Sequence, residues 1–387
     1  MSRFGDGLAT GADLRAVAAD ATTAALRPLD GRVPDLVCVF VCATDPDEVA
    51  AVGEQVAALT GAGTLLGCRA GGVIGGGRGV EGSGAVSVFA AVLPGVRVRS
   101  FHLEVLHAEG SAAVVGLPER EGEEIAVLLS DPYSFPADGF LAQANTALPG
   151  LSVVGGQADS PQGPGSTRLL LDGRAVDRGA VGVLLKDSDA TTIVSQGCRP
   201  VGPAMTVTAA EGNVVHGLAG VPALDKVRSL LADLPPADQA LASSGLQFGI
   251  AMNEYAEDHD FLVRAIMGTA RVGGGLVVGD LVEVGQTVRL QVRDADAAEA
   301  DLRAHLSAYR RDSRDAPVGG ALLFSCNGRG ANLFGTSYGG ADHDPALVRR
   351  ELAAQGVAGF FAGGELGPVG GRNHLHGFTA SLLAFPG

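Results

Sequence analysis

The hydrophobic residues of this chain follow one pattern that occurs three times. The first copy opens with the continuous apolar run Asp35–Thr44, whose length and Val content are typical of a strand buried on both faces. An Asp-Pro pair follows, and apolar residues then recur at helical spacing until Gly61. A second short apolar stretch, a glycine-rich segment and the Val-rich run Ala85–Leu93 complete the copy. We expect Val96–Val105 to pair with that last strand across a Pro-Gly turn.

The second copy begins with the strand-like run Glu124–Ser130, and the third begins with Gly320–Ser325. In both copies a helix that starts at a proline follows, then a strand that ends in a Gly-Gly pair, and then a further strand. This order predicts duplication within an α/β to α+β fold, in which repeated strand–helix–strand–Gly-Gly–strand units form mixed β-sheets flanked by helices, in two domains. A layered αββα sandwich is the alternative arrangement. The unequal spacing of the copies argues against a solenoid.

A region of different character separates the second and third copies. It contains several strand-like stretches and the amphipathic helix Asp294–Arg311, which is acidic at its start and basic at its end. The segment Pro200–Pro203, after Cys198, is the best candidate for a domain boundary. We therefore predict a helical lead-in over residues 1–28, an N-terminal domain over 29–198 and a C-terminal domain over 199–387.

Composition narrows the classes of function. Of the 387 residues, 46% are hydrophobic and 18% are charged, so the chain can bury a large core. A net charge of −15 and the absence of Trp make nucleic acid a poor partner. The five cysteines form no CxxC pair, which argues against a disulfide framework or a zinc ribbon. We see neither a signal peptide nor an apolar run of about 18 residues, so we expect a cytoplasmic protein without membrane contact.

Polar residues gather where the apolar strands end, which is where open α/β sheets bind ligands. In the third copy the strand leads into a loop that contains Cys326, Asn327 and Arg329. An Arg in this place can clamp a carboxylate at two points, an Asn offers a donor and an acceptor, and neighbouring glycines expose backbone N–H groups. Glu365 follows a Gly-Gly pair and needs a partner if it is buried, and Arg372 is a candidate for that partner.

The same residues allow other interpretations. The Arg329 loop can be a tight turn with a surface side chain. His374 and His376 lie two positions apart and would point the same way in a strand, where they could bind zinc with Glu365 or His343. We expect instead that these histidines are hydrogen-bonded polar groups beside a pocket, and that the chain holds no metal and no cofactor.

An enzymatic alternative rests on Cys326. With His343 or His376 as its base, this thiol could act as the nucleophile of a cysteine-dependent hydrolase or transferase. The sequence contains no GxSxG nucleophile elbow, no Walker A loop and no HExxH helix, so enzymatic activity is the less favoured interpretation.

The sequence resembles the FIST proteins, which combine an N-terminal and a C-terminal FIST part. The N-terminal resemblance covers about residues 29–198 and is most specific at Pro34–Ala43 and Leu66–Gly77. The C-terminal resemblance covers about residues 199–385 and is based on Leu323–Gly335, Asp342–Asp344 and Val357–Ser381. It implies a sensory domain of signal transduction that binds small ligands, amino acids being favoured. In bacteria the module is often fused to signalling output domains. None is recognisable here, so the resemblance implies a stand-alone sensor that reports through a separate signalling protein.

These observations combine into one expectation, a cleft between the two parts that binds a small zwitterion such as an amino acid. Arg329 or Arg372 would hold the carboxylate of the ligand, and Glu365 or an Asp of Asp342–Asp344 would hold its ammonium group. The expected ligand-binding residues are Cys326, Asn327, Arg329, Gly330, Asp342, His343, Gly364, Glu365, Arg372, Asn373 and His376. A protein-interaction scaffold is the remaining alternative.

Overall fold

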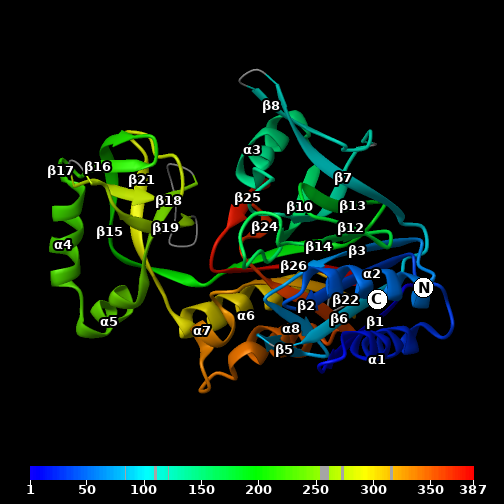
Figure 1. Ribbon diagram of the computed structural model, residues 1–387. Helices are drawn as coiled ribbons and strands as arrows, with labels where there is room; N and C mark the ends of the chain where they lie inside the picture. Colours follow the sequence, from blue (N-terminus) through cyan, green and yellow to red (C-terminus); the bar gives the residue numbers. More distant parts are fainter. Residues whose placement is uncertain (83, 109–110, 121, 253–260, 272–273, 314–316) are drawn as a thin grey trace. The chain divides into compact units, whose positions relative to one another are not determined.

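The computed structural model describes residues 1–387 except 83, 109–110, 121, 253–260, 272–273 and 314–316 (Figure 1). The chain forms two compact units. Unit 1 comprises Met1–Ser195, Leu302–Leu375 and Thr379–Gly387, and unit 2 comprises Gln196–Asp301 with His376–Phe378. The division of the sequence into domains at residues 28 and 198 remains a prediction. Within the described ranges, no helix is both long and apolar enough to span a membrane.

The helices of the described residues are α1 (Leu14–Leu26), α2 (Pro46–Thr60), α3 (Ala137–Ala147), α4 (Ala223–Asp233), α5 (Pro236–Gly245), α6 (Ala295–Asp312), α7 (Gly330–Phe334) and α8 (His343–Leu352), with the 3-10 turns η1 (Arg27–Leu29) and η2 (Gly340–Asp342). Helix α2 shows why they form where they do. The Asp45 side chain caps its start by accepting a hydrogen bond from the Asp47 N–H at 2.9 Å, and Gly61 ends it with φ of +57°.

Three sheets belong to unit 1. The first has the strand order β1 (Arg3–Thr10), β6 (Ala85–Val92), β2 (Leu36–Cys42), β3 (Thr64–Arg69), β11 (Leu169–Leu171) and β12 (Arg174–Val176). The second has the order β25 (Arg372–His376), β24 (Glu365–Val369), β10 (Leu151–Gln157), β9 (Glu124–Ser130), β13 (Ala180–Lys186), β7 (Arg97–Ala108) and β8 (Ser111–Val115). The third has the order β14 (Thr191–Gln196), β26 (Thr379–Pro386), β22 (Val318–Cys326), β23 (Gly356–Ala362), β4 (Gly72–Gly75) and β5 (Arg78–Glu81).

The three predicted copies are three structural repeats within unit 1. In each repeat the first strand runs parallel to the strand that follows its helix, as in β2 with β3, β9 with β10 and β22 with β23. The last strand of each repeat, β6, β13 or β26, then pairs antiparallel with the first strand. The expectation of repeated units in mixed sheets flanked by helices is therefore confirmed.

The strands that follow the glycine-rich turns are exchanged among the repeats. Strand β4 of the first repeat pairs with β23 of the third, β24 of the third pairs with β10 of the second, and β11 of the second pairs with β3 of the first. The exchange joins the three repeats into one unit. The expected pairing of Val96–Val105 with Ala85–Leu93 is wrong. Strand β7 pairs with β13 in the second sheet, so these two segments do not form a hairpin.

One apolar core lies between the inner faces of the three sheets. It contains Phe40 of β2, Val127 of β9, Phe324 of β22 and Phe360 of β23, and the ring centroids of Phe40 and Phe360 are 5.1 Å apart. Helices cover the outer faces, with α1 and α2 on the first sheet, α3 on the second, and α6 and α8 on the third. The central strands are thus buried on both faces, which explains why their sequences are apolar throughout.

Unit 2 has its own seven-stranded sheet and its own core. Its strands in order are β15 (Cys198–Glu211), β21 (Thr287–Arg293), β18 (Leu246–Ala251), β19 (Phe261–Thr269), β20 (Leu276–Val278), β16 (Val214–Leu218) and β17 (Val221–Pro222). Every second residue of β21, at Val288, Leu290 and Val292, packs into a core that α4 and α5 complete.

Candidate functional site

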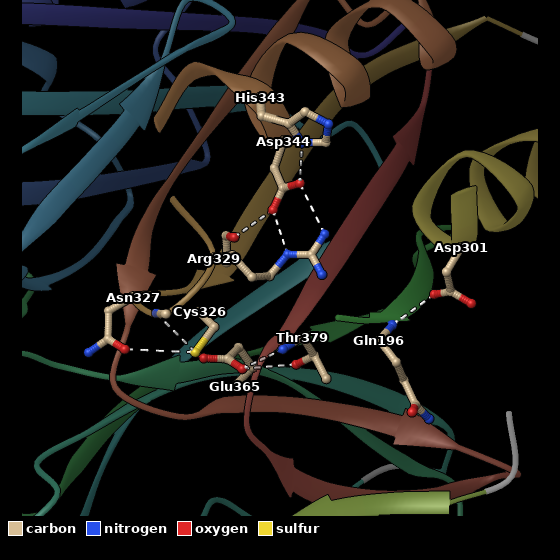
Figure 2. Close-up of polar contacts among 11 residues, drawn as sticks. Gln196, Asp301, Cys326, Asn327, Arg329, His343, Asp344, Glu365 and Thr379 are labelled. Carbon is tan, nitrogen blue, oxygen red and sulfur yellow. Dashed lines mark hydrogen bonds and ion pairs between the residues drawn. The ribbon is translucent and has the colours of Figure 1, made fainter. Parts of the chain in front are cut away.

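The strand β22 ends at Cys326, and Arg329 in the loop that follows forms a buried ion pair with Asp344 of α8 (Figure 2). Arg329 donates two hydrogen bonds to Asp344, from Nε to Oδ2 at 2.7 Å and from Nη2 to Oδ1 at 3.0 Å. The side chains are 0% and 2% exposed. Two further groups surround the carboxylate, because the Ser325 hydroxyl donates to Oδ2 at 2.8 Å and His343 Nδ1 lies 3.0 Å from Oδ1.

The environment of Asp344 fixes its charge. Burial alone would raise the pKa of this carboxyl group, but the charge of Arg329 and the hydrogen bond from His343 hold the pKa well below its usual range. Asp344 is therefore ionised at neutral pH. The fork of Arg329 that we expected to hold a ligand carboxylate holds this internal carboxylate instead.

Glu365, the first residue of β24, behaves in the opposite way. Its side chain is fully buried, and Thr379 donates to its Oε2 from the backbone N–H at 3.1 Å and from the hydroxyl at 2.9 Å. Burial raises the pKa of Glu365 to about 8, against the lowering effects of Thr379, the Cys326 thiol and the Arg329 charge. Glu365 is consequently a neutral acid at pH 7.

Cys326 lies on the Glu365 side of the ion pair, whereas His343 lies on the Asp344 side (Figure 2). Cys326 is 5% exposed, and the Gly328 N–H donates to its sulfur at 3.4 Å. The His343 ring stacks on Phe334, with the ring centroids 3.6 Å apart. The structure thus directs His343 toward Asp344 and Phe334.

Two other predicted residues of the third repeat bind the exchanged hairpin of the first. The Gly79 N–H donates to Asp342 Oδ1 at 2.8 Å. The Ala331 N–H donates to Glu81 Oε2 at 3.1 Å, and a Cβ on Gly330 would lie 2.3 Å from the other oxygen of Glu81. Gly330 thus lies directly beside an internal carboxylate.

The remaining predicted residues have separate positions. The Asn373 side chain is buried and bonds the backbone of β10, accepting from the Val153 N–H and donating to the Leu151 carbonyl, both at 2.8 Å. The Gly364 carbonyl accepts from the Gln157 N–H at 2.8 Å. Asn327 and Arg372 are exposed, and His376 is buried at the end of β25. Among the residues that the structure describes, no three His, Cys, Asp or Glu side chains form a group that could hold a metal ion.

The equivalent strand ends of the first repeat form a cavity, which we call the strand-end cavity. Its volume is about 450 Å³, and it lies where β2 and β3 end. Its charged lining residues are Arg69, Asp159 and Glu48. The rest of the lining is mostly small or apolar, including Gly11, Ala12, Leu14, Cys42, Ala43, Ala70 and Pro161.

Arg69 is the last residue of β3 and is 1% exposed. Its Nε and Nη2 donate to the carbonyls of Ala43 and Thr44 at 3.0 and 2.8 Å, and its Nη1 donates to the Ser166 carbonyl at 2.7 Å and to Gln162 Oε1 at 3.1 Å. Burial lowers the pKa of Arg69, and the charge of Asp159 raises it. This guanidinium therefore fixes two loops at the cavity and brings a positive charge to it.

Asp159 supplies the opposite charge. Burial raises the pKa of its carboxyl group, while the Arg69 charge and the Ser160 N–H lower it. Glu48, in the first turn of α2, is exposed at the same cavity. One buried cation and two carboxylates thus border a hollow whose other walls are largely apolar.

Arg69, Asp159 and Glu48 were not among the residues predicted from the sequence. Both strands that end here were predicted, and the rule that ligands bind where parallel strands end was the signal that could have found Arg69. Cys42 and Cys326 mark the equivalence, because each ends the central strand of its repeat. Arg329, Asp344 and Glu365 fill this position in the third repeat, whereas the first repeat leaves it hollow.

Known proteins and family models match this chain along nearly its whole length. Residues 35–221 match the FIST N domain, and residues 223–368 match the FIST C domain. An uncharacterized protein of Mycobacterium tuberculosis is 39% identical over 387 residues, which cover 99% of each chain. An uncharacterized protein of Mycobacterium bovis is 38% identical over 389 residues, which cover 99% of this chain and 98% of that protein.

Proposed function

The chain belongs to the family of proteins with a FIST N and a FIST C domain, a family associated with sensing in signal transduction. From this premise we propose that it is a sensor that binds a small zwitterion, such as an amino acid, in the strand-end cavity. The observation that carries the proposal is the presence of Arg69 and Asp159 in one hollow of about 450 Å³. That volume is within the range of about 300–1,000 Å³ that is usual for small-molecule sites.

The charges of the cavity match those of a zwitterion. Asp159 accepts the ammonium group of the ligand, and Glu48 at the rim reinforces the negative potential. The carboxylate of the ligand lies toward Arg69. Within the described residues, four of the five N–H groups of Arg69 donate to protein oxygens, but the guanidinium keeps its positive charge. A hydrogen bond between charged groups contributes about 1.5–3 kcal/mol, so two such contacts are enough for weak, reversible sensing.

The apolar part of the lining receives the ligand side chain. Ala12, Leu14, Ala43 and Pro161 border the cavity with little bulk. A small aliphatic side chain can therefore be buried there, at about 0.8 kcal/mol for each CH₂ group removed from water.

The hydrogen bonds of Arg69 suggest how binding is reported. This side chain fixes the loop after β2, through Ala43 and Thr44, and the loop after β10, through Gln162 and Ser166. A ligand that binds best when both loops are held in place shifts the population toward that state. A separate signalling protein would read the state of these loops.

The test is a thermal-unfolding screen of the full chain against the twenty amino acids at millimolar concentration. A ligand at 100 times its Kd stabilises the folded protein by about 2.7 kcal/mol. The Asp159→Asn variant should lose the response, whereas Asp20→Asn, which removes an exposed carboxylate of α1, should keep it. If no amino acid stabilises the wild type, or if the Asp159 variant responds equally, the proposal is wrong.

A further inference from the structure

Unit 1 has a second hollow between strand β14 and helix α6, which we call the β14 groove. Its volume is about 610 Å³, and Pro368 of β24 and Pro386 of β26 are among its lining residues. It is separate from the strand-end cavity and shares no lining residue with it.

The strand wall of the groove is the edge of a β-sheet. Among the described strands, β14 is the outermost of its sheet and has β26 as its neighbour. The four consecutive residues Thr191–Val194 all border the groove. Because successive side chains of a strand point to opposite faces, four in a row can border one hollow only where it follows the edge of the strand. Such an edge can pair with an added strand.

Two of the usual protections of an edge, charge and proline, are missing from this segment. Natural proteins protect exposed strand edges with Lys, Pro or inward-pointing charges. The four residues here are Thr191, Thr192, Ile193 and Val194, and none of them is charged or a proline. The edge is therefore compatible with pairing.

The helix side of the groove is a single stripe of α6. His305, Ala308, Tyr309 and Asp312 recur at helical spacing and all border the groove. The stripe spans about 10 Å at 1.5 Å per residue, and four strand residues span about 13 Å at 3.3 Å per residue. The two walls are thus similar in length, about that of four extended residues.

The charges of the groove select the occupant. Asp189 and Asp312 are exposed, and the described residues that line the groove include neither Lys nor Arg. The C-terminal end of α6 adds a partial negative charge. The last turn of that helix contains Arg310, which donates to the Glu351 carbonyl, and the exposed Arg311, and neither of them lines the groove. A second copy of this chain, with a net charge of −15, is an unfavourable occupant.

We propose that the β14 groove binds an extended, basic segment of a partner protein by strand addition. The backbone of that segment pairs with Thr191–Val194, and its Lys or Arg side chains lie near Asp189 and Asp312. Its apolar side chains lie against Val369 and Pro386. The groove would be a docking surface that does not depend on the proposed ligand site.

A peptide selection tests this proposal. Random octapeptides displayed on phage are selected on the full-length wild type and, in parallel, on Asp189→Lys/Asp312→Lys. The wild type should enrich peptides in which Lys or Arg alternates with apolar residues, and the double variant should not. The matched control is Asp20→Lys/Glu54→Lys, which makes the same change of net charge on exposed positions of α1 and α2 and should select like the wild type.

A synthetic peptide of the enriched sequence then tests the binding mode. It should protect the amides of Thr191–Val194 from hydrogen exchange, and N-methylation of alternate peptide amides should weaken binding at least tenfold. The proposal is overturned by no enrichment, by acidic peptides, by equal enrichment on the groove variant, or by protection elsewhere.

Discussion

Arg329 and Asp344 form a two-point ion pair in which neither side chain is more than 2% exposed. The pair connects the loop after β22 to the start of α8, and Ser325 and His343 complete the coordination of the carboxylate. Two charges buried so fully are stable only as a pair, because each alone would carry a large cost of desolvation. The pair is therefore a structural element of the third repeat.

The first prediction concerns this pair. Asp344→Ala leaves the guanidinium of Arg329 buried without its carboxylate, and should lower the free energy of unfolding by about 3–5 kcal/mol. Urea denaturation measures the change. The control is Asp225→Ala, whose partner Arg228 is exposed, as is Asp225 itself. It should cost no more than about 0.5 kcal/mol, and equal effects of the two substitutions would contradict the structural role.

The second prediction concerns the pH dependence of Glu365. Its pKa of about 8 in the folded state lies above the unfolded value, so the folded protein binds more protons over the interval between them. The stability that this group contributes is complete below the unfolded pKa and is lost as pH rises toward 8. For one proton the slope is at most about 1.4 kcal/mol per pH unit.

Replacing Glu365 with Gln removes this titration. Urea denaturation of the wild type and of Glu365→Gln at pH 5, 6, 7 and 8 should show the difference in stability moving in favour of the variant as pH rises. A difference that does not change with pH would mean that Glu365 is not held neutral.

The third prediction concerns the cysteines. Burial raises the pKa of the Cys38 and Cys68 thiols, so neither should react with iodoacetamide while the protein is folded. Cys326 is 5% exposed, and Cys198 is more exposed than the other four. Mass spectrometry of alkylated peptides at pH 7 should find Cys198 modified first. Faster modification of Cys326 would instead favour the cysteine-dependent enzyme.

The fourth prediction concerns Gly359 at the centre of β23. A Cβ at this position would lie 1.7 Å from the Leu323 carbonyl oxygen on the neighbouring strand β22. Gly359→Ala must therefore push two hydrogen-bonded strands apart, and should destabilise the protein by more than about 3 kcal/mol.

The matched substitution is Gly139→Ala in α3, where a Cβ meets nothing within 4 Å. It should stabilise the protein by about 0.5–1 kcal/mol, because Gly is the weaker helix former. Thermal unfolding compares the two, and similar effects would contradict the close approach of the strands.

The repeats could be predicted from sequence because their signals are local. Apolar runs buried on both faces, the Asp45 cap and the stop at Gly61 each act within a few residues of the chain. The grouping of Cys326, Arg329 and Glu365 was likewise predictable in part, because side chains that follow parallel strands share one edge of a sheet.

The strand with which each strand pairs could not be predicted in the same way. The Gly-Gly pairs indicated where strands follow, but the sheet that each strand joins depends on other repeats, as β4 shows by pairing with β23. The interaction of Glu81 with the start of α7, 250 residues further along, has no local signal.

The sequence by itself determined the repeated strand–helix–strand units, because backbone conformation follows from local patterns of apolar residues, caps and turns. Only the tertiary structure decided that Arg329 holds Asp344, and that Arg69 and Asp159 border a cavity. The physical reason is that a charge takes its partner from whatever the fold brings within a few ångströms, and the exchange of strands among the repeats sets that neighbourhood at long range.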